Sequence, residues 1–341
     1  MTVLVVRLDS VGDVLLAGPA VRAVAATDEV VLLCSPAGAP AAHLLPGVSA
    51  TMTWRCPWID GCPPYVSRAD VADVVARVAA HQVSTAVVLT SFHQSPLPTA
   101  LLLRLAGVPR IGAVSVDYPG SLLDVRLRPG IDLPEDLPEA RRALAVVTAL
   151  GYHLPPGDDG RLALRRLPAV ELPPQPYVVL HPGASAPARA WSADRCAAAV
   201  EALVAAGHRV VVTGGPGETA LTARVAGRHA VDLGGRTSLA QLAAVLAGAD
   251  AVVVGNTGPA HLAAAVGTPV VSLFAPVVPA AKWAPYGVPH VVLGDQRAPC
   301  AGTRATVCPV PGHPCVDSVE PGDVVRAVVG LLGRVGRGSR P

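Results

Sequence analysis

Asp13 has the side chain best placed to act as a base. It follows an apolar segment, residues 3–8, after a short loop, and stands where a second apolar segment, residues 14–26, begins. Gly12 before it permits a tight turn, and the amides of a helix N-terminus favour an ionised carboxylate. Such a carboxylate in a cleft can accept a proton from a hydroxyl group. The alternative is a carboxylate that only caps its helix.

The loop at residues 181–191 is suited to bind a phosphate group. It reads H-P-G-A-S-A-P-A-R-A-W, and its small residues let a ligand approach the backbone closely. Ser185 can hydrogen-bond a phosphate oxygen, and Arg189 can neutralise its charge. We expect Trp191 to pack beneath the loop. The alternative is an ordinary strand-to-helix loop with a surface arginine.

Residues 256–261, N-T-G-P-A-H, form a second segment of this kind. Pro259 fits the first turn of a helix, where no amide hydrogen is needed, so the segment predicts a helix start. The free amides there, together with Thr257, make an anion site. His261 lies one turn further and faces the same ligand; the alternative for His261 is a core position.

Glu218 ends a third segment, G-G-P-G-E at residues 214–218. This segment is neither a G-x-G-x-x-G dinucleotide fingerprint nor a Walker A loop, and the missing fingerprint argues against a dehydrogenase. Glu218 can accept hydrogen bonds from ribose hydroxyls. The alternative is a plain glutamate at a helix N-terminus.

Alternating strands and helices must position these residues. In the first half we expect strands at residues 3–8, 29–34, 85–89 and 110–113, and helices at residues 14–26, 71–80, 101–106 and 140–150. In the second half we expect strands at residues 177–181, 209–213, 251–254 and 270–274, and helices at residues 192–206, 238–247, 258–266 and 321–332. This α/β alternation predicts parallel sheets with right-handed crossovers.

Pro- and Gly-rich stretches at residues 154–160 and 166–176 indicate a linker between the two halves. We therefore predict two Rossmann-like domains that face each other, residues 1–165 and residues 166–341. In open parallel sheets ligands bind beyond the carboxyl ends of the strands. Asp13 and the three later loops all follow predicted strands.

The composition of the 341-residue chain supports this architecture. Hydrophobic residues make up 51% and aromatic residues only 3%, so the core must consist of Ala, Val and Leu, which suit buried parallel strands. The net charge is +2 and no basic run stands out, which argues against a nucleic-acid partner.

The chain has no run of about 18 uninterrupted apolar residues and no recognisable signal peptide. We expect a cytoplasmic monomer, with peripheral attachment to the inner face of the cell membrane left open. The cysteines number seven, an odd count that argues against a disulfide scaffold. Cys300, Cys308 and Cys315 lack the spacing of common zinc modules, so reduced thiols are favoured over a structural metal.

Several segments, in order along the chain, together resemble glycosyltransferase family 9, the bacterial heptosyltransferases. They are V-L-V-V-R-L-D-S-V-G-D-V-L-L-A-G-P-A at the start, then H-P-G-A-S and R-A-W, T-G-G-P-G-E, G-R-T-S-L-A-Q-L and N-T-G-P-A-H-L-A-A-A-V-G-T-P. The resemblance covers roughly residues 1–332. It implies a GT-B fold of two facing Rossmann-like domains, with an N-terminal acceptor domain, a C-terminal nucleotide-sugar domain and a last helix that packs back on the first domain.

The resemblance also implies the reaction. It is an inverting transfer of a heptose or related sugar from an ADP-sugar to a hydroxyl of a glycan or glycolipid, and it needs no metal or other cofactor. Asp13 matches the catalytic base, and Gly12 belongs to the same substrate-binding loop. The usual family acceptor is the inner core of lipopolysaccharide.

The donor side is assigned through the same resemblance. Arg189 stands where the family often has a lysine beside the diphosphate, and Ser185 matches a phosphate contact. Glu218 matches a ribose contact, and Thr237 falls in the adenine pocket. The helix start at residues 257–261 matches the part that contacts phosphate and sugar. The residues assigned to the nucleotide sugar are Ser185, Arg189, Glu218, Thr237, Asn256, Thr257, Gly258 and His261.

One position departs from the family pattern. Asn256 stands where the family usually has Asp, and an amide both donates and accepts where a carboxylate only accepts. The identity of the donor sugar is therefore open. The first half has few clustered basic residues, which favours another envelope glycan or a small molecule over a strongly anionic acceptor.

Three other functions remain alternatives at this stage. The first is a transferase that uses another nucleotide sugar and a small-molecule acceptor. The second is a protein that binds a nucleotide sugar without catalysis, and the third is a nucleotide-sugar epimerase of the same fold. An epimerase would form product from the donor alone, and a binding protein would release no ADP with any acceptor.

Overall fold

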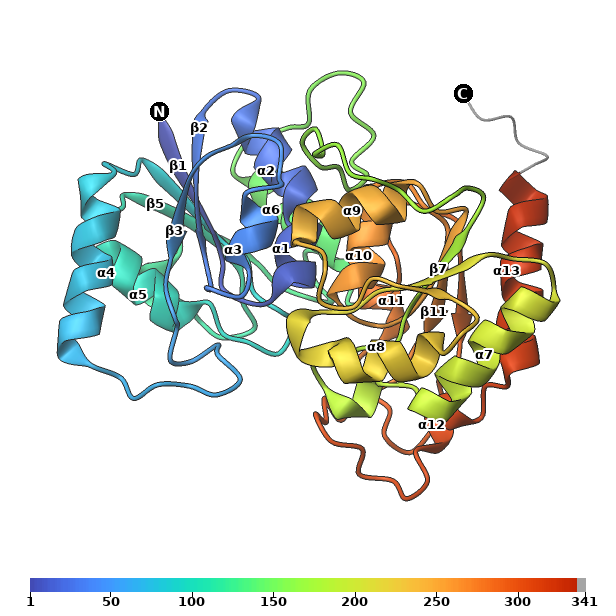
Figure 1. The fold of residues 1–341 in the computed structure, drawn as a ribbon. Helices are drawn as coiled ribbons and strands as arrows, with labels where there is room; N and C mark the ends of the chain where they lie inside the picture. Colours follow the sequence, from blue (N-terminus) through green and yellow to red (C-terminus); the bar gives the residue numbers. More distant parts are fainter. Residues whose placement is uncertain (336–341) are drawn as a thin grey trace. The chain divides into compact units, whose positions relative to one another are not determined.

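The computed structural model describes residues 1–335 and consists of two compact units, Met1–Arg165 and Arg166–Pro341. Each unit contains one six-stranded sheet, in which every strand pairing is parallel. The ribbon in Figure 1 shows both sheets with their helices. The expected α/β class with two Rossmann-like domains is confirmed.

The sheet of the first unit has the strand order β3-β2-β1-β4-β5-β6. Its strands are β1 (Thr2–Arg7), β2 (Glu29–Cys34), β3 (Val48–Thr53), β4 (Thr85–Val88), β5 (Arg110–Val114) and β6 (Val125–Leu127). Its helices are α1 (Val11–Leu16), α2 (Gly18–Ala25), α3 (Ala39–Ala42), α4 (Arg68–Ala80), α5 (Leu97–Leu105) and α6 (Glu139–Ala149), with a 3-10 turn at Gly120–Leu122.

The sheet of the second unit has the order β12-β11-β10-β7-β8-β9. Its strands are β7 (Val178–His181), β8 (Val210–Val212), β9 (Val231–Asp232), β10 (Ala251–Gly255), β11 (Val270–Leu273) and β12 (His290–Leu293). Its helices are α7 (Ala193–Ala205), α8 (Thr219–Ala226), α9 (Leu239–Ala247), α10 (Gly258–Ala265), α11 (Ala280–Trp283), α12 (Pro314–Asp317) and α13 (Pro321–Val335), with 3-10 turns at Pro187–Arg189 and Pro216–Glu218.

Both orders are the dinucleotide-binding Rossmann order. In each sheet the strand order reverses between the first and fourth strands of the unit, which are β1 and β4 in the first and β7 and β10 in the second. Ligands of such sheets bind outside the carboxyl ends of the strands at this reversal. A ligand-binding site is therefore expected beside the residues that follow these four strands.

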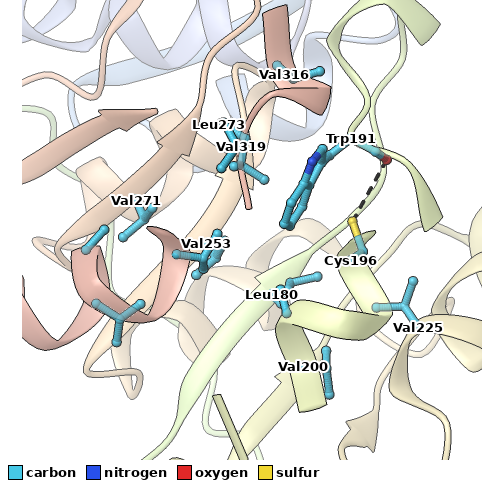
Figure 2. Packing of buried hydrophobic residues seen from close by; sticks show 14 of the residues in the cluster. Leu180, Trp191, Cys196, Val200, Val225, Val253, Val271, Leu273, Val316 and Val319 are labelled. Atoms are coloured by element: carbon cyan, nitrogen blue, oxygen red, sulfur yellow. Dashed lines mark hydrogen bonds between the residues drawn. The ribbon is translucent and has the colours of Figure 1, made fainter. Parts of the chain in front are cut away.

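Small apolar side chains form both cores, as the composition predicts. In the first unit, Leu4 and Val6 of β1 pack with Val74 of α4 and Leu103 of α5. In the second unit, helices α7, α8 and α13 cover one face of the sheet. Figure 2 shows the buried Trp191 ring in this second core, near Cys196, so this residue packs beneath its loop as expected.

Apart from shifted helix ends and the short helices α3, α11 and α12, which the pattern did not predict, the structure differs from the sequence prediction in two respects. The helix expected at residues 14–26 is broken at Ala17 into α1 and α2, because Pro19 has no amide hydrogen to donate to the carbonyl of Leu15. The second difference concerns the outermost strands of both sheets, β3, β6, β9 and β12, which the sequence pattern did not predict.

Helix α13 packs against α7 and the neighbouring strands of its own unit. Its expected return to the first unit stays a prediction, as do the roles assigned to the two domains. Within residues 1–335 we find no helix with the length and hydropathy of a membrane span.

Replacement of Leu103 by Ala tests the core of the first unit. The Leu103 side chain is 2% exposed, and its loss should lower the free energy of unfolding by about 2–5 kcal/mol. Leu105 on the same helix is 64% exposed, so Leu105→Ala should change the free energy of unfolding by no more than about 0.5 kcal/mol. Urea unfolding followed by circular dichroism measures both, and equal losses would contradict the packing described.

Candidate active site

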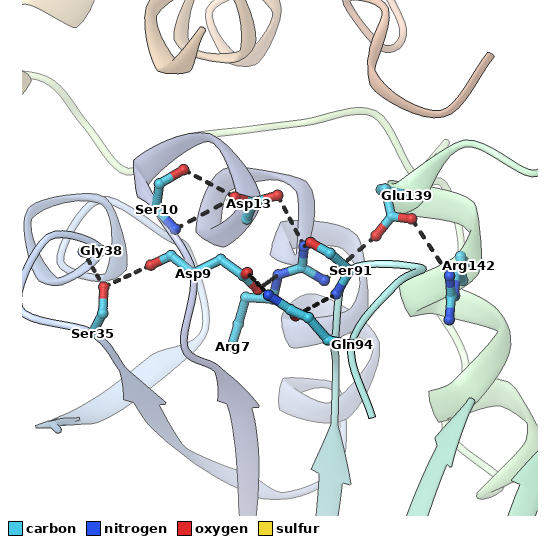
Figure 3. A network of polar contacts seen from close by, with 10 residues as sticks. All are labelled: Arg7, Asp9, Ser10, Asp13, Ser35, Gly38, Ser91, Gln94, Glu139 and Arg142. Carbon is cyan, nitrogen blue, oxygen red and sulfur yellow. Dashed lines mark hydrogen bonds and ion pairs between the residues drawn. The ribbon is translucent and has the colours of Figure 1, made fainter. Parts of the chain in front are cut away.

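A buried arginine organises the carboxyl edge of the first sheet. Arg7 is the last residue of β1 and is only 3% exposed. Its Nη2 donates to Asp13 Oδ1 at 2.9 Å and to Ser91 Oγ at 3.0 Å. Its Nε lies 3.0 Å from Asp9 Oδ2, and its Nη1 lies 3.5 Å from Glu139 Oε2. Figure 3 shows these groups converging on the guanidinium from separate elements.

Asp13 is held through both of its carboxylate oxygens. Oδ1 accepts from Arg7, and Oδ2 accepts from Ser10 Oγ at 2.9 Å and from the Ser10 amide at 3.4 Å. The helix-capping alternative is thus part of the structure, because the Ser10 amide precedes α1. Capping uses Oδ2 alone, however, and the ion pair with Arg7 lies on the other oxygen.

The other carboxylates of this network are more enclosed. Asp9 Oδ1 accepts from Gln94 Nε2 at 2.6 Å. Burial raises the pKa of the Asp9 carboxyl above its ordinary value; Arg7 opposes the rise and Asp13 adds to it. Glu139 begins α6, is 2% exposed and lies 3.7 Å from Arg142 Nη1. Burial alone would lower the pKa of Arg7, but the three carboxylates raise it.

His181 ends β7, beside the reversal point of the second sheet. Its Nδ1 lies 2.9 Å from the hydroxyl of Thr213, which is fully buried after β8. Burial lowers the pKa of His181 to about 4, so its ring is neutral at pH 7. Its Nε2 lies 3.9 Å from Glu218, and with a neutral ring this approach is not an ion pair.

Glu218 folds back over the backbone of two neighbouring loops. Its Oε2 accepts from the amide of Gly215 at 2.7 Å. A Cβ at Gly183 would lie 2.0 Å from Glu218 Oε1, so a side chain at this position would displace the carboxylate. The structure thus brings Glu218 beside the loop that holds Ser185, and its predicted contact with ribose stays a prediction.

Asn256 is 5% exposed, and its side-chain amide both donates a hydrogen bond to and accepts one from the backbone of a single residue. Its Nδ2 donates to the carbonyl of Ala275 at 3.1 Å, and its Oδ1 accepts from the Ala275 amide at 3.2 Å. An amide side chain has the donor and acceptor that this pair needs, and a carboxylate has no donor. Asn256 therefore ties the end of β10 to the residues that follow β11.

Arg189 and the start of α10 lie beside Asn256. Arg189 Nη1 is 3.5 Å from the Asn256 carbonyl. Thr257 is the N-cap residue of α10 and is 8% exposed, and among the described residues its hydroxyl has no hydrogen-bond partner. Gly258 begins the helix, and His261 is 5% exposed one turn further. The predicted helix start is confirmed, and it lies at the carboxyl end of β10.

The remaining predicted residues stand at the edges of these groups. Ser185 is exposed in the β7 loop, and Thr237 is half-buried directly before the capped start of α9. Gly12 is buried in the first turn of α1. The roles of all these residues stay predictions.

Sequence reasoning missed five members of the Arg7 network: Arg7, Asp9, Ser91, Gln94 and Glu139. Arg7 had a signal, since a charged residue ends an otherwise apolar strand. Glu139 had none, because it is 132 residues from Arg7 in the chain.

The cysteines are free thiols, and Cys300 and Cys315 are fully buried. In the part of the chain that the structure describes, no group of three or more His, Cys, Asp or Glu side chains could hold a metal ion. The preference for reduced thiols over a structural metal stays a prediction.

The two Rossmann-like units have the topology of the GT-B fold, and solved structures of heptosyltransferases have the same fold. E. coli ADP-heptose LPS heptosyltransferase II is 19% identical, with a TM-score of 0.72 over 98% of this chain and 100% of that chain. A glycosyl transferase family 9 protein from Veillonella parvula is 16% identical, with a TM-score of 0.74 over 98% and 97%. E. coli heptosyltransferase WaaC with ADP-2-deoxy-2-fluoro heptose is 21% identical, with a TM-score of 0.68 over 97% and 99%.

The chain belongs to glycosyltransferase family 9, the heptosyltransferase family, whose sequence profile matches residues 96–312. No curated protein matches the chain. The family match confirms the resemblance inferred from the motifs. It begins after Asp13, so the role of that residue is a separate question.

His181 makes the stability of the fold depend on pH. The unfolded chain takes up a proton on this ring below about pH 6.5, and the folded protein only below about pH 4. Between these values the unfolded state binds more protons, so a fall in pH destabilises the fold, by up to about 3 kcal/mol in total. His181→Gln should remove the loss of folding stability that comes from this ring. His229→Gln changes a histidine at an exposed site and should leave that loss unchanged. Urea unfolding midpoints measured from pH 7 to pH 4 give the loss of stability. An equal dependence of the midpoint on pH in the wild type and in both variants would contradict the contribution of His181.

Asn256→Asp tests the bridge to Ala275. The substitution replaces the donor with an oxygen that faces the Ala275 carbonyl, so we expect a loss of about 1–3 kcal/mol at pH 7. The measurement is the urea midpoint at pH 7. A variant as stable as the wild type would mean that the bridge contributes nothing and that the position is free to serve the donor sugar.

Proposed function

We propose that this protein transfers a heptose, or a closely related sugar, from an ADP-sugar to a hydroxyl group of a glycan or glycolipid, with inversion and with Asp13 as the general base. The family assignment supports sugar transfer. The observation that supports Asp13 is its carboxylate, which is 17% exposed and fixed through Oδ1 by a buried arginine at the reversal point of the first sheet.

In the proposed reaction Asp13 takes the proton of the acceptor hydroxyl. The freed oxygen attacks the anomeric carbon, and the bond from that carbon to the diphosphate oxygen breaks on the opposite face. The transition state resembles an oxocarbenium ion, and negative charge grows on the departing ADP. Fixed donors and cations that meet this charge lower the barrier.

The second unit has groups suited to that leaving group. Arg189 supplies a positive charge beside the start of α10. The N-terminus of α10 carries the positive end of the helix dipole, and the Thr257 hydroxyl lies directly before it. Two independent kinds of anion-binding group thus meet at the carboxyl end of β10. We assign the diphosphate to this place without a metal ion.

The acceptor is the less constrained partner. In the first unit Arg55 pairs with Asp60 and Arg104 pairs with Asp124, so these arginines are already matched by carboxylates. This pairing favours a neutral or weakly charged glycan over a strongly anionic one. A small-molecule acceptor remains the second candidate.

The function is tested by ADP release from ADP-heptose in the presence of candidate acceptors, with wild type and Asp13→Ala. We expect both proteins to bind ADP-heptose, and only the wild type to release ADP when an acceptor is present. Loss of the base should lower the rate by about 10²–10⁴-fold. Binding is followed by calorimetry, which separates a dead variant from an unfolded one.

Other results would redirect the assignment. Binding of a different nucleotide sugar in place of ADP-heptose would keep the class and remove the heptose. Binding with no turnover on any acceptor would favour a protein that only binds the nucleotide sugar. Strong turnover with a lipid A–Kdo acceptor and none with neutral acceptors would refute the neutral-acceptor proposal.

A further inference from the structure

We propose that Arg7 is the positioning residue of the base: it fixes Oδ1 of Asp13, while Asp9 and Glu139 balance its charge, so that Oδ2 is the atom that receives the proton. The proposal rests on the proposed function, because it assigns a role to Arg7 only if Asp13 is the base. Its evidence is the geometry of the buried network around Arg7 (Figure 3).

The guanidinium of Arg7 reaches its partners in three directions. Nη2 binds Asp13 and Ser91, Nε faces Asp9, and Nη1 faces Glu139. A planar, rigid fork with fixed donors can hold such an arrangement, and it does not lose its proton. Rotation of the Asp13 carboxylate would break the 2.9 Å bond at Oδ1, so Arg7 determines how the base is oriented.

The two oxygens of Asp13 lie in different surroundings. Oδ1 faces the buried Arg7, whereas Oδ2 faces Ser10, which is exposed. The hydroxyl of Ser10 can rotate away and leave a lone pair of Oδ2 to an incoming hydroxyl. The proton of that acceptor hydroxyl then moves to Oδ2 as its oxygen bonds the anomeric carbon and ADP departs.

The charge of the network explains why a base can work beside an arginine. An opposite charge within about 4–6 Å normally makes a carboxylate a weaker base. Here Asp9 and Glu139 share the charge of Arg7, and three carboxylates face two guanidiniums, those of Arg7 and Arg142. Asp13 is therefore oriented by a cation whose field is largely cancelled by other groups.

Other charged groups stand on the elements around α1. Arg22 of α2 is bound to Asp158 through Nε at 2.6 Å and Nη2 at 2.8 Å. The exposed groups are His43 after α3, His93 after β4 and Arg141 of α6. Solvent screens these exposed charges, so we expect Arg7, Asp9 and Glu139 to dominate the field at Asp13.

The test measures the acid limb of the pH profile of kcat/KM with ADP-heptose and an accepted acceptor. Arg7→Met removes the cation, so the limb should move up by about one pH unit. Glu139→Gln removes a balancing anion, so the limb should move down. Arg7→Lys keeps the charge but cannot reach in three directions, so the limb should stay in place while kcat falls by on the order of 10²-fold.

A matched control is Arg77→Met, which removes an arginine from an exposed pair with Asp73 in the same unit and should change neither rate nor limb. Circular dichroism and the unfolding midpoint establish that each variant folds. If Arg7→Met does not fold, because it leaves buried carboxylates unpaired, then Glu139→Gln and Arg7→Lys decide the matter.

The two proposals fail in distinguishable ways. An Asp13→Asn variant with wild-type turnover would remove Asp13 as the base and, with it, the role of Arg7. An inactive Asp13→Asn variant would leave Asp13 in place. In that case an acid limb unmoved in Glu139→Gln and in a folded Arg7→Met, or moved in the same direction in both, would overturn the Arg7 assignment alone.

Discussion

Every described pairing in the two sheets of this protein is parallel, and this constraint governs the rest of the structure. A parallel sheet must be covered by helices on both faces, and its crossovers place all strand carboxyl ends at one edge. The Rossmann order then opens a crevice where the strand order reverses. The four strands that flank the two reversal points are β1, β4, β7 and β10. At or just beyond their ends lie Asp13, Ser91, His181 and Asn256, which are far apart in the chain.

The polar chemistry differs between the two reversal points. At the first, full charges meet: Arg7 is surrounded by carboxylates, and its burial is tolerable because each of its nitrogens faces an anion. At the second, the buried groups are neutral: His181 is uncharged, and Asn256 binds a backbone amide and carbonyl. Arg189 and the start of α10 lie beside Asn256 at this second point.

The chain keeps its fold at 16–21% identity to solved relatives, with TM-scores of 0.68–0.74. Its core consists mainly of Ala, Val and Leu at strand and helix positions, which many sequences can supply if volume and pattern are kept. At Asn256 the side-chain amide donates to the Ala275 carbonyl.

The sequence by itself determined the fold class, the four central strands of each sheet and the loops that follow them. Those strands are buried on both faces, so they read as unbroken apolar runs, and each is followed by small or polar residues. The edge strands β3, β6, β9 and β12 are partly exposed, and β6 and β9 have only two or three residues, so they gave a weaker signal. Only the tertiary structure decided that Glu139 meets Arg7 and that Asn256 meets Ala275. These contacts join distant positions, and a buried charge or amide takes whichever partner the packing of helices and strands brings within reach.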